Sequence, residues 1–277
     1  MTLLLTCATR EYVIQASDRR ISWNDPSKEP YDQGKAIFYC GRIAVAYTGV
    51  ANIEGDTARW LAHLLAKATD IEAGLDSIGA ATGTYFARER LNIEHFVVAT
   101  GWAMRQGQPP AGMPFIAASS NTYGNSLHEF RTRVNFVKPG VPFLGYDFGQ
   151  PLKREEREKL YVAVRSALKF RTEPGSIARA FADQIRLVAS GNDDRASKVS
   201  KAVLVQCLSR SAIGTGQTLG GTIFSGIGPN PNGCVYLAED GSVAEWKTPW
   251  IACGGSVVAE GGGSITPGGP SIFSSAT

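Results

Sequence analysis

The chain begins Met1-Thr2-Leu3-Leu4-Leu5-Thr6-Cys7-Ala8-Thr9, and this run, with the residues that follow it to Gly49, decides the fold. A polar break at Arg10-Glu11 leads into a second apolar run, Tyr12-Val13-Ile14-Gln15-Ala16, which ends at Ser17-Asp18. Two apolar runs separated by a short polar break predict two strands joined by a tight turn. Most chain ends are loose, but here a strand begins at residue 2 or 3. We therefore expect the start of the chain to lie at the end of a sheet.

Thr2 can carry chemistry once Met1 is removed, and removal of methionine is the general expectation before a small residue. Thr2 would then hold a hydroxyl and a free α-amino group together. An α-amine titrates at about 7.7–8.0, so it can accept a proton at neutral pH. A threonine hydroxyl is a weak nucleophile until such a base lies beside it. Thr2 is thus a candidate nucleophile with its own base; the alternative is that Met1 is retained and Thr2 has no role.

The residues that follow resemble the proteasome β-type subunits of the N-terminal-nucleophile (Ntn) hydrolase superfamily. That family has a nucleophilic threonine at the mature terminus, an Asp-Arg-Arg-like turn after the second strand, a lysine opening the third strand and a Ser/Thr-Gly pair before the first helix. In this chain these positions fall on Thr2, Asp18, Lys35 and Thr48-Gly49. The last two come one residue late, which one inserted residue in the loop 23–33 explains. The resemblance is good over residues 2–68, fair in layout to residue 208 and absent beyond it.

The resemblance implies a role for each of these residues. The Lys35 ammonium would favour the deprotonated hydroxyl of Thr2 and keep the amine neutral. Asp18 would hold Lys35 in place, because a buried lysine is costly unless it is paired. The backbone N–H of Gly49 would stabilise a developing oxyanion. The alternatives are that Asp18 and Lys35 form a purely structural pair and that Gly49 only makes a tight turn.

Three further positions follow from the same resemblance. Ser22 would bind the backbone of a substrate through its own main chain, if a peptide lies along the cleft as an added strand. Asp194 and Ser197 match the family's Asp-x-x-Ser, which supports the amine of the nucleophile. The chain departs from the family at Leu144-Gly145-Tyr146-Asp147, where a Gly-Ser-Gly-like turn would place another serine near the nucleophile. Tyr146 takes that place, so the supporting hydrogen bonds must differ.

The order of the remaining elements predicts an α+β fold. Apolar residues recur at helical spacing over 52–68, 70–88, 153–170 and 176–189, although Gly74, Gly79 and Gly83 oppose the second helix. Strand-like runs cover 35–40, 42–48, 95–102, 115–119, 127–137 and 201–208. Strands, a helix pair, strands, a helix pair and a strand give two sheets face to face with helices outside each. This four-layer αββα sandwich is also what the resemblance implies.

The composition divides the chain into three parts. Residues 1–210 would form the Ntn-hydrolase-like αββα domain. Residues 211–253 form a Gly-rich C-terminal extension in which 234–237 and 243–246 predict a β-hairpin turning at Asp240-Gly241. Residues 254–277 are rich in Gly, Ser and Pro and predict a disordered tail.

Charge and cysteine content exclude several classes of protein. A net charge of +3 over 277 residues implies neither nucleic acid nor an anionic membrane as the obligatory partner. The five cysteines are scattered, which predicts buried free thiols in a reducing compartment. The three histidines are not at ligand spacing, so we expect no metal site. No run approaches the roughly 18 apolar residues that span a bilayer, and residues 1–7 lack the basic region of a signal peptide, so we expect a cytoplasmic protein.

Together with the resemblance, the sequence therefore predicts a threonine-type hydrolase that cleaves amide (peptide) bonds through a threonyl ester and without a cofactor. The family assembles into rings or stacks, so the resemblance also implies a homo-oligomer. Two alternatives stay open. One is a catalytically inactive structural subunit of a proteasome-like assembly, and the other is an amidase acting on a small non-peptide substrate.

Overall fold

The computed structural model describes residues 2–21, 31–32, 34–39, 43–103, 113–170, 174–210, 233–237, 243–247, 250–253, 255–258 and 262–263. Over these residues the chain folds into two large sheets, a two-stranded ribbon and four α-helices, so the predicted α+β class is confirmed. Ser22 lies outside the described residues.

Within the described part of the chain, the first sheet has seven strands in the order β10-β1-β2-β11-β12-β13-β16, and all neighbours are antiparallel. These strands are β1 (Leu3–Thr9), β2 (Tyr12–Asp18), β10 (Phe143–Gly149), β11 (Val203–Ser209), β12 (Gly233–Leu237), β13 (Val243–Lys247) and β16 (Gly262–Gly263). The register opposes Leu4 to Ser17 and Leu3 to Gly149. The start of β1 and the ends of β2 and β10 therefore lie at the same end of the sheet.

The second sheet, as far as the structure describes it, has the order β15-β14-β5-β6-β7-β8-β9, antiparallel except where β14 runs parallel to β5. Its strands are β5 (Ala36–Tyr39), β6 (Ile43–Thr48), β7 (Phe96–Ala103), β8 (Met113–Ser120), β9 (Arg131–Phe136), β14 (Trp250–Cys253) and β15 (Ser256–Val258). The ribbon pairs β3 (Arg20–Ile21) with β4 (Tyr31–Asp32). Every residue of β5 and β6 is buried, as expected for strands covered on both faces.

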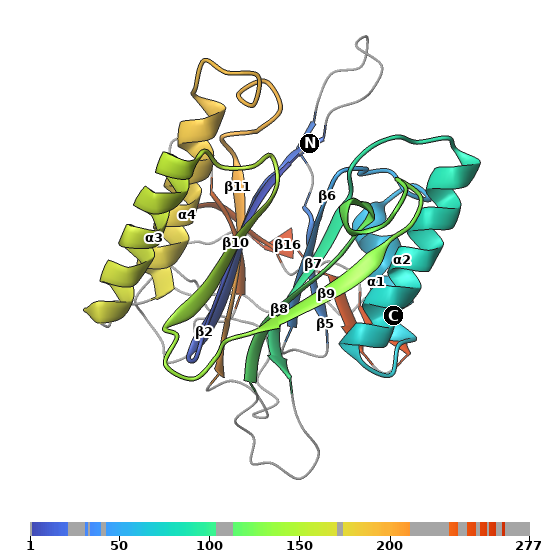
Figure 1. Cartoon of the computed structure of the whole chain (residues 1–277), viewed down its shortest axis with the longest axis horizontal. Coiled ribbons are helices and arrows are strands. Elements are labelled where there is room, and N and C mark those ends of the chain that lie inside the picture. The colour runs from blue at the N-terminus through green and yellow to red at the C-terminus, as the bar shows by residue number, and fades with distance from the viewer. Residues whose placement is uncertain are drawn as a thin grey trace.

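The helices are α1 (Thr57–Ala66), α2 (Ile71–Arg88), α3 (Arg154–Lys169) and α4 (Pro174–Ala189), with one 3₁₀ turn, η1 (Asn121–Tyr123). Figure 1 shows α3 and α4 on the outer side of the first sheet and α1 and α2 on the outer side of the second. One apolar cluster joins α3 and α4 to the first sheet, a second joins α1 and α2 to the second sheet, and a third fills the space between the sheets. Leu3 and Leu5 belong to the first cluster and Leu4 to the third, so β1 is buried on both faces.

Three expectations from the sequence are wrong in detail. Residues 144–147, read as a turn, lie inside β10, an edge strand that pairs with β1. The first helix begins at Thr57 rather than near residue 52, because Glu54 and Gly55 have positive φ and Asp56 caps the helix by accepting from the N–H of Ala58. The fourth helix, expected from residue 176, begins at Pro174.

The C-terminal strands extend both sheets. β12 and β13 pair within the residues predicted as a hairpin, and β12 also pairs with β11. β14 joins the second sheet beside β5, and β15 and β16 lie within the segment predicted as a tail. The Gly-rich segment 211–232 lies outside the described residues. Of the helices that the structure describes, none is both long and apolar enough to cross a membrane.

Candidate active site

Four strand ends bring the predicted catalytic residues together. Thr2 directly precedes β1, Asp18 ends β2, Lys35 directly precedes β5 and Thr48 ends β6. Because β1 pairs antiparallel with β2, and β5 with β6, each pair of residues lies at one end of its sheet. Contacts of Thr2 with Lys35 and with Thr48 then join the two sheet ends.

The side chains at this junction are shielded from water. Thr2 is 3% exposed, Asp18 0% and Lys35 1%. The Lys35 ammonium donates hydrogen bonds to the hydroxyl of Thr2, to the carbonyl of Arg20 at 2.9 Å and to the carbonyl of Asp18 at 3.4 Å. The backbone carbonyls of Asp18 and Arg20 therefore hold a buried cation against the candidate nucleophile.

Asp18 connects three separate segments of backbone. Its Oδ2 accepts from the N–H of Leu3 at 2.6 Å, and its Oδ1 accepts from Arg20 at 2.9 Å and from Ser200 at 3.4 Å. Burial raises the pKa of the Asp18 carboxyl, while the charge of Lys35 and the three N–H donors act in the opposite direction. The carboxylate thus fixes the start of β1 beside the lysine.

The backbone of Thr2 is held from the other side. Its carbonyl accepts from the Thr48 hydroxyl at 2.9 Å and from the N–H of Gln150 at 3.2 Å. Gly149 has φ +80°, and a Cβ there would lie 2.0 Å from the Thr2 carbonyl oxygen, so only glycine fits. The resemblance implies that Tyr146 takes the place of a serine near the nucleophile. In the structure Tyr146 opposes Thr6, further along the strand pair, so Tyr146 does not take that place beside Thr2.

Gly49 follows β6 in a turn that is closely packed against His95. Gly49 has φ +114°, and a Cβ there would lie 2.7 Å from both the carbonyl oxygen of Glu94 and Nδ1 of His95. The N–H of the next residue, Val50, donates to His95 Nδ1 at 3.2 Å. The turn that carries the candidate oxyanion donor is thus fixed by a histidine side chain.

His95 is a functional candidate that the sequence did not identify. It is fully buried, its backbone N–H donates to Asn121, and its ring packs on Tyr47, Phe86 and Phe130. Burial lowers its pKa to about 3, so the ring is neutral and Nδ1 is free to accept. No spacing rule could have identified it, because its partner at Val50 lies 45 residues away.

Asp194 and Ser197 lie in the loop before β11 and are both exposed. The Ser197 hydroxyl donates to the carbonyl of Asp194 at 3.0 Å, and the Ser197 carbonyl accepts from the Arg20 guanidinium at 2.9 Å. The hydrogen bonds described here do not join either side chain to Thr2. The loop reaches the site instead through the backbone of Ser200, which donates to Asp18.

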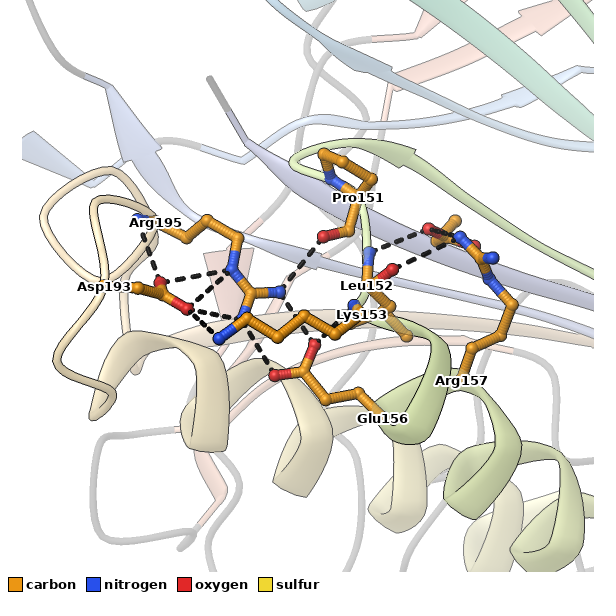
Figure 2. A network of polar contacts seen from close by, with 8 residues as sticks. Pro151, Leu152, Lys153, Glu156, Arg157, Asp193 and Arg195 are labelled. Atoms are coloured by element: carbon orange, nitrogen blue, oxygen red, sulfur yellow. Dashed lines mark hydrogen bonds and ion pairs between the residues drawn. The ribbon is translucent and has the colours of Figure 1, made fainter.

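A charged network fixes this loop to the start of α3 (Figure 2). Arg195 forms a bidentate pair with Glu156, at 2.7 and 2.8 Å, and also binds Asp193 at 2.7 Å and the carbonyl of Pro151 at 3.0 Å. Lys153 binds Asp193 at 2.8 Å. Hydrogen bonds from Arg195 and Lys153 hold the pKa of the Asp193 carboxyl well below its usual range.

Metal chemistry finds no support among the residues described. No group of three or more His, Cys, Asp or Glu side chains in this part of the chain could hold a metal ion. Cys7 and Cys207 are buried free thiols, and burial raises the pKa of both, so neither is a reactive thiolate.

Comparison with known proteins assigns no family. No family model matches the chain, and no curated protein matches it. Solved structures that resemble it include a Gly-1 mutant of Anbu from Hyphomicrobium sp. strain MC1, at 12% identity and TM-score 0.49 over 76% of this chain and 82% of that one. Another is Anbu (ancestral beta-subunit) from Yersinia bercovieri, at 8% identity and TM-score 0.47 with the same coverage. A third, described as a helical assembly of the Anbu complex from Pseudomonas aeruginosa, has 12% identity and TM-score 0.39 over 74% of this chain and 81% of that one.

These comparisons correct the resemblance drawn from the sequence. The similar structures are Anbu proteins and not β-type subunits of the proteasome, so the assignment to that family is wrong. Sequence identities of 8–14% with TM-scores below 0.5 carry no assignment of function either.

Proposed function

We propose that the chain is a threonine-type hydrolase that cleaves amide bonds with Thr2 as an N-terminal nucleophile. The observation that carries the proposal is the hydrogen bond from the buried Lys35 ammonium to the hydroxyl of Thr2, which directly precedes the buried strand β1. The proposal includes the four-layer αββα sandwich expected from the order of the elements.

In the first step the Thr2 hydroxyl oxygen attacks the carbonyl carbon of the amide. The hydroxyl proton passes to the free α-amine of Thr2, which titrates at about 7.7–8.0 in the absence of other influences. The Lys35 ammonium favours the alkoxide and keeps the amine neutral through like-charge repulsion. Asp18 keeps both groups in place through its contacts with Leu3 and Arg20.

In the following steps a tetrahedral oxyanion forms and collapses. The N–H of Gly49 is the candidate donor to this oxyanion, because the Gly49 turn follows Thr48, whose hydroxyl binds the carbonyl of Thr2. The C–N bond breaks, the α-amine returns its proton to the leaving amine, and a threonyl ester remains. Water then attacks the ester with the α-amine as base, which releases a carboxylic acid and restores Thr2.

The experiment measures intact mass before and after treatment with a peptide β-lactone or epoxyketone. We expect a mass that lacks whatever precedes Thr2, and one covalent adduct that is retained in Thr2→Ser and lost in Thr2→Ala. Thr69→Ala, an exposed threonine elsewhere on the chain, is the matched control and should keep the adduct. A retained residue before Thr2, or an adduct that survives in Thr2→Ala, would falsify the proposal.

Turnover assays separate the remaining candidates. Cleavage of fluorogenic peptides supports a peptidase, and cleavage of small acyl amides alone supports an amidase for a non-peptide substrate. A processed chain that forms no adduct and cleaves neither class is an inactive structural subunit.

We also propose that copies of the chain associate through a surface formed by α3 and α4.

A further inference from the structure

A cavity of about 510 Å³ opens between β9 and β10, the edge strands of the two sheets. Its lining includes Ile116, Tyr123, Arg133, Asn135, Tyr146 and Phe148 and none of Thr2, Asp18 or Lys35. The cavity is therefore a second site, and its volume falls in the range of pockets that bind small molecules.

The inner wall of the cavity is apolar and rigid. Ile116 is 1% exposed and Phe148 is 8% exposed, so both side chains belong to the core between the sheets. The rings of Tyr146 and Phe148 lie with centroids 6.1 Å apart, and Phe96 packs on both Phe148 and Tyr123. Packed aromatic rings change little on binding, so a ligand would meet a preformed wall.

Arg133 gives the cavity one positive charge. Its guanidinium carbon lies 4.2 Å from the centroid of the Tyr123 ring, which holds the side chain in place. No carboxylate among the described residues forms an ion pair with Arg133, whereas Arg131, two residues earlier on β9, pairs with Glu129 at 2.7 Å. The planar fork of an exposed guanidinium that packs on an aromatic ring and has no described carboxylate partner is suited to a carboxylate.

We propose that this cavity binds an organic carboxylate attached to an aromatic or apolar group. Arg133 would pair with the carboxylate, and the wall formed by Ile116 and Phe148 would cover the apolar part. One cationic side chain matches the charge of a monoanion, whereas a phosphate dianion would favour at least two cationic side chains. Burial raises the pKa of Tyr123, so its hydroxyl stays protonated and can donate to the ligand.

Two sources could supply this chemistry: a free arylalkyl acid, or the C-terminal carboxylate of a peptide that ends in an aromatic residue. The proposal does not depend on the chemistry of Thr2. Binding is therefore measured with the full-length Thr2→Ala variant, so that turnover cannot interfere and a failure here does not bear on the proposed hydrolase.

The protein is titrated with 3-phenylpropionate, with its neutral amide and with acetyl-Ala-Phe. Binding is measured by calorimetry and by changes in the protein's NMR chemical shifts. We expect the carboxylate to bind at least about tenfold more tightly than the amide, since a hydrogen bond to a charged group is worth that factor. Tight binding of acetyl-Ala-Phe relative to 3-phenylpropionate identifies a peptide C-terminus as the ligand, and the reverse order identifies a free acid.

Two arginine variants on the same strand decide the role of the charge. Arg133→Gln should weaken carboxylate binding about tenfold and leave binding of the amide unchanged. Arg131→Gln, which removes an exposed arginine already paired with Glu129, should bind like the parent chain. Equal binding of acid and amide, equal effects of the two substitutions, or no saturable binding in the millimolar range would overturn the proposal.

Discussion

At the scale of single residues, the site rests on a buried lysine and a buried carboxylate that each need the other. Burial raises the pKa of Asp18, and the charge of Lys35 opposes that change. Lys35→Met keeps most of the side-chain volume but leaves the Asp18 carboxylate without this cation. We expect a loss of about 3 kcal/mol in the free energy of unfolding, because breaking a buried pair leaves a charge uncompensated.

Urea denaturation of Lys35→Met, Asp18→Asn and the double variant measures this coupling. The double variant should recover part of the stability that Lys35→Met loses. The covalent inhibitor adduct on Thr2 should be absent in Lys35→Met and in the double variant. A double variant less stable than either single variant, with additive losses, would show that the two charges do not depend on each other.

His95 makes stability depend on pH in a predictable direction. Its pKa is lowered from an ordinary value of 6.5 to about 3 in the folded chain, so the unfolded chain binds the proton more readily. The contribution of the neutral His95 ring to the free energy of unfolding is fully present above pH 6.5. It is lost as the pH falls from there towards 3, and the loss is roughly 3 kcal/mol at pH 4. His95→Gln removes the titration and offers another acceptor to Val50.

Urea midpoints of the parent chain and His95→Gln between pH 7 and 4 test this prediction. Carboxylates titrate in both proteins, so the difference between the two curves isolates His95. We expect that difference to shift in favour of His95→Gln as the pH falls. Parallel curves would mean that His95 is not the buried neutral group described here.

At the scale of elements, a charged network joins the loop before β11 to α3, and the same loop contacts Asp18 through Ser200. Arg195 is 13% exposed in its side chain and Glu156 25%, so their bidentate pair is partly shielded from water. Arg195→Met should release the loop and speed amide hydrogen exchange at Ser200, whose N–H binds Asp18. Global stability should fall by about 1–3 kcal/mol.

Hydrogen exchange of Arg195→Met is compared with that of Arg154→Met. Arg154 also forms an ion pair on α3, with Glu158, but its side chain is 91% exposed, so its loss should change stability by less than about 0.5 kcal/mol. Exchange at Ser200 that rises equally in both variants, or in neither, contradicts a specific role for Arg195.

The elements themselves could largely be predicted from local pattern, and the failures have local causes. α2 forms despite three interior glycines because the glycines permit close packing: a Cβ at Gly83 would lie 2.3 Å from the carbonyl oxygen of His128. Helix propensity scales give each interior glycine an unfavourable free energy and contain no term for such a tertiary contact. β10 was missed because the family resemblance placed a turn at residues 144–147, whereas Gly145 packs against Tyr161 within the strand.

At the scale of the whole molecule, the predictable part of the site was the order of residues along adjacent strands. Antiparallel pairing of β1 with β2 places Thr2 and Asp18 at one end of the first sheet, whereas Lys35 belongs to the second sheet and reaches Thr2 through the packing of the two sheets. The contacts of Ser200 with Asp18 and of Gln15 with Val98 span 182 and 83 residues. Contacts of that kind depend on the packing of sheets and loops, which no spacing in the sequence records.

Association of copies is the remaining prediction at this scale, and the described surface indicates where it would occur. The most exposed large apolar side chains are Phe170 at 71%, Leu187 at 67% and Val162 at 60%, against 36–40% for the others described. Val162 lies on α3, Leu187 lies on α4 and Phe170 directly follows α3. Exposed apolar side chains gathered on one helix pair favour burial against a second copy.

We expect light scattering to give a mass above the monomer's 29.6 kDa that grows with protein concentration. Leu187→Glu should shift that mass towards the monomer, because a buried unpaired charge opposes association. Ala80→Glu places the same charge on the exposed side of α2 and should leave the mass unchanged. Circular dichroism shows whether both variants keep the parent fold, so a lower mass can be attributed to the surface. A monomer at every concentration, or equal masses for the two variants, would show that this helix pair does not join copies of the chain.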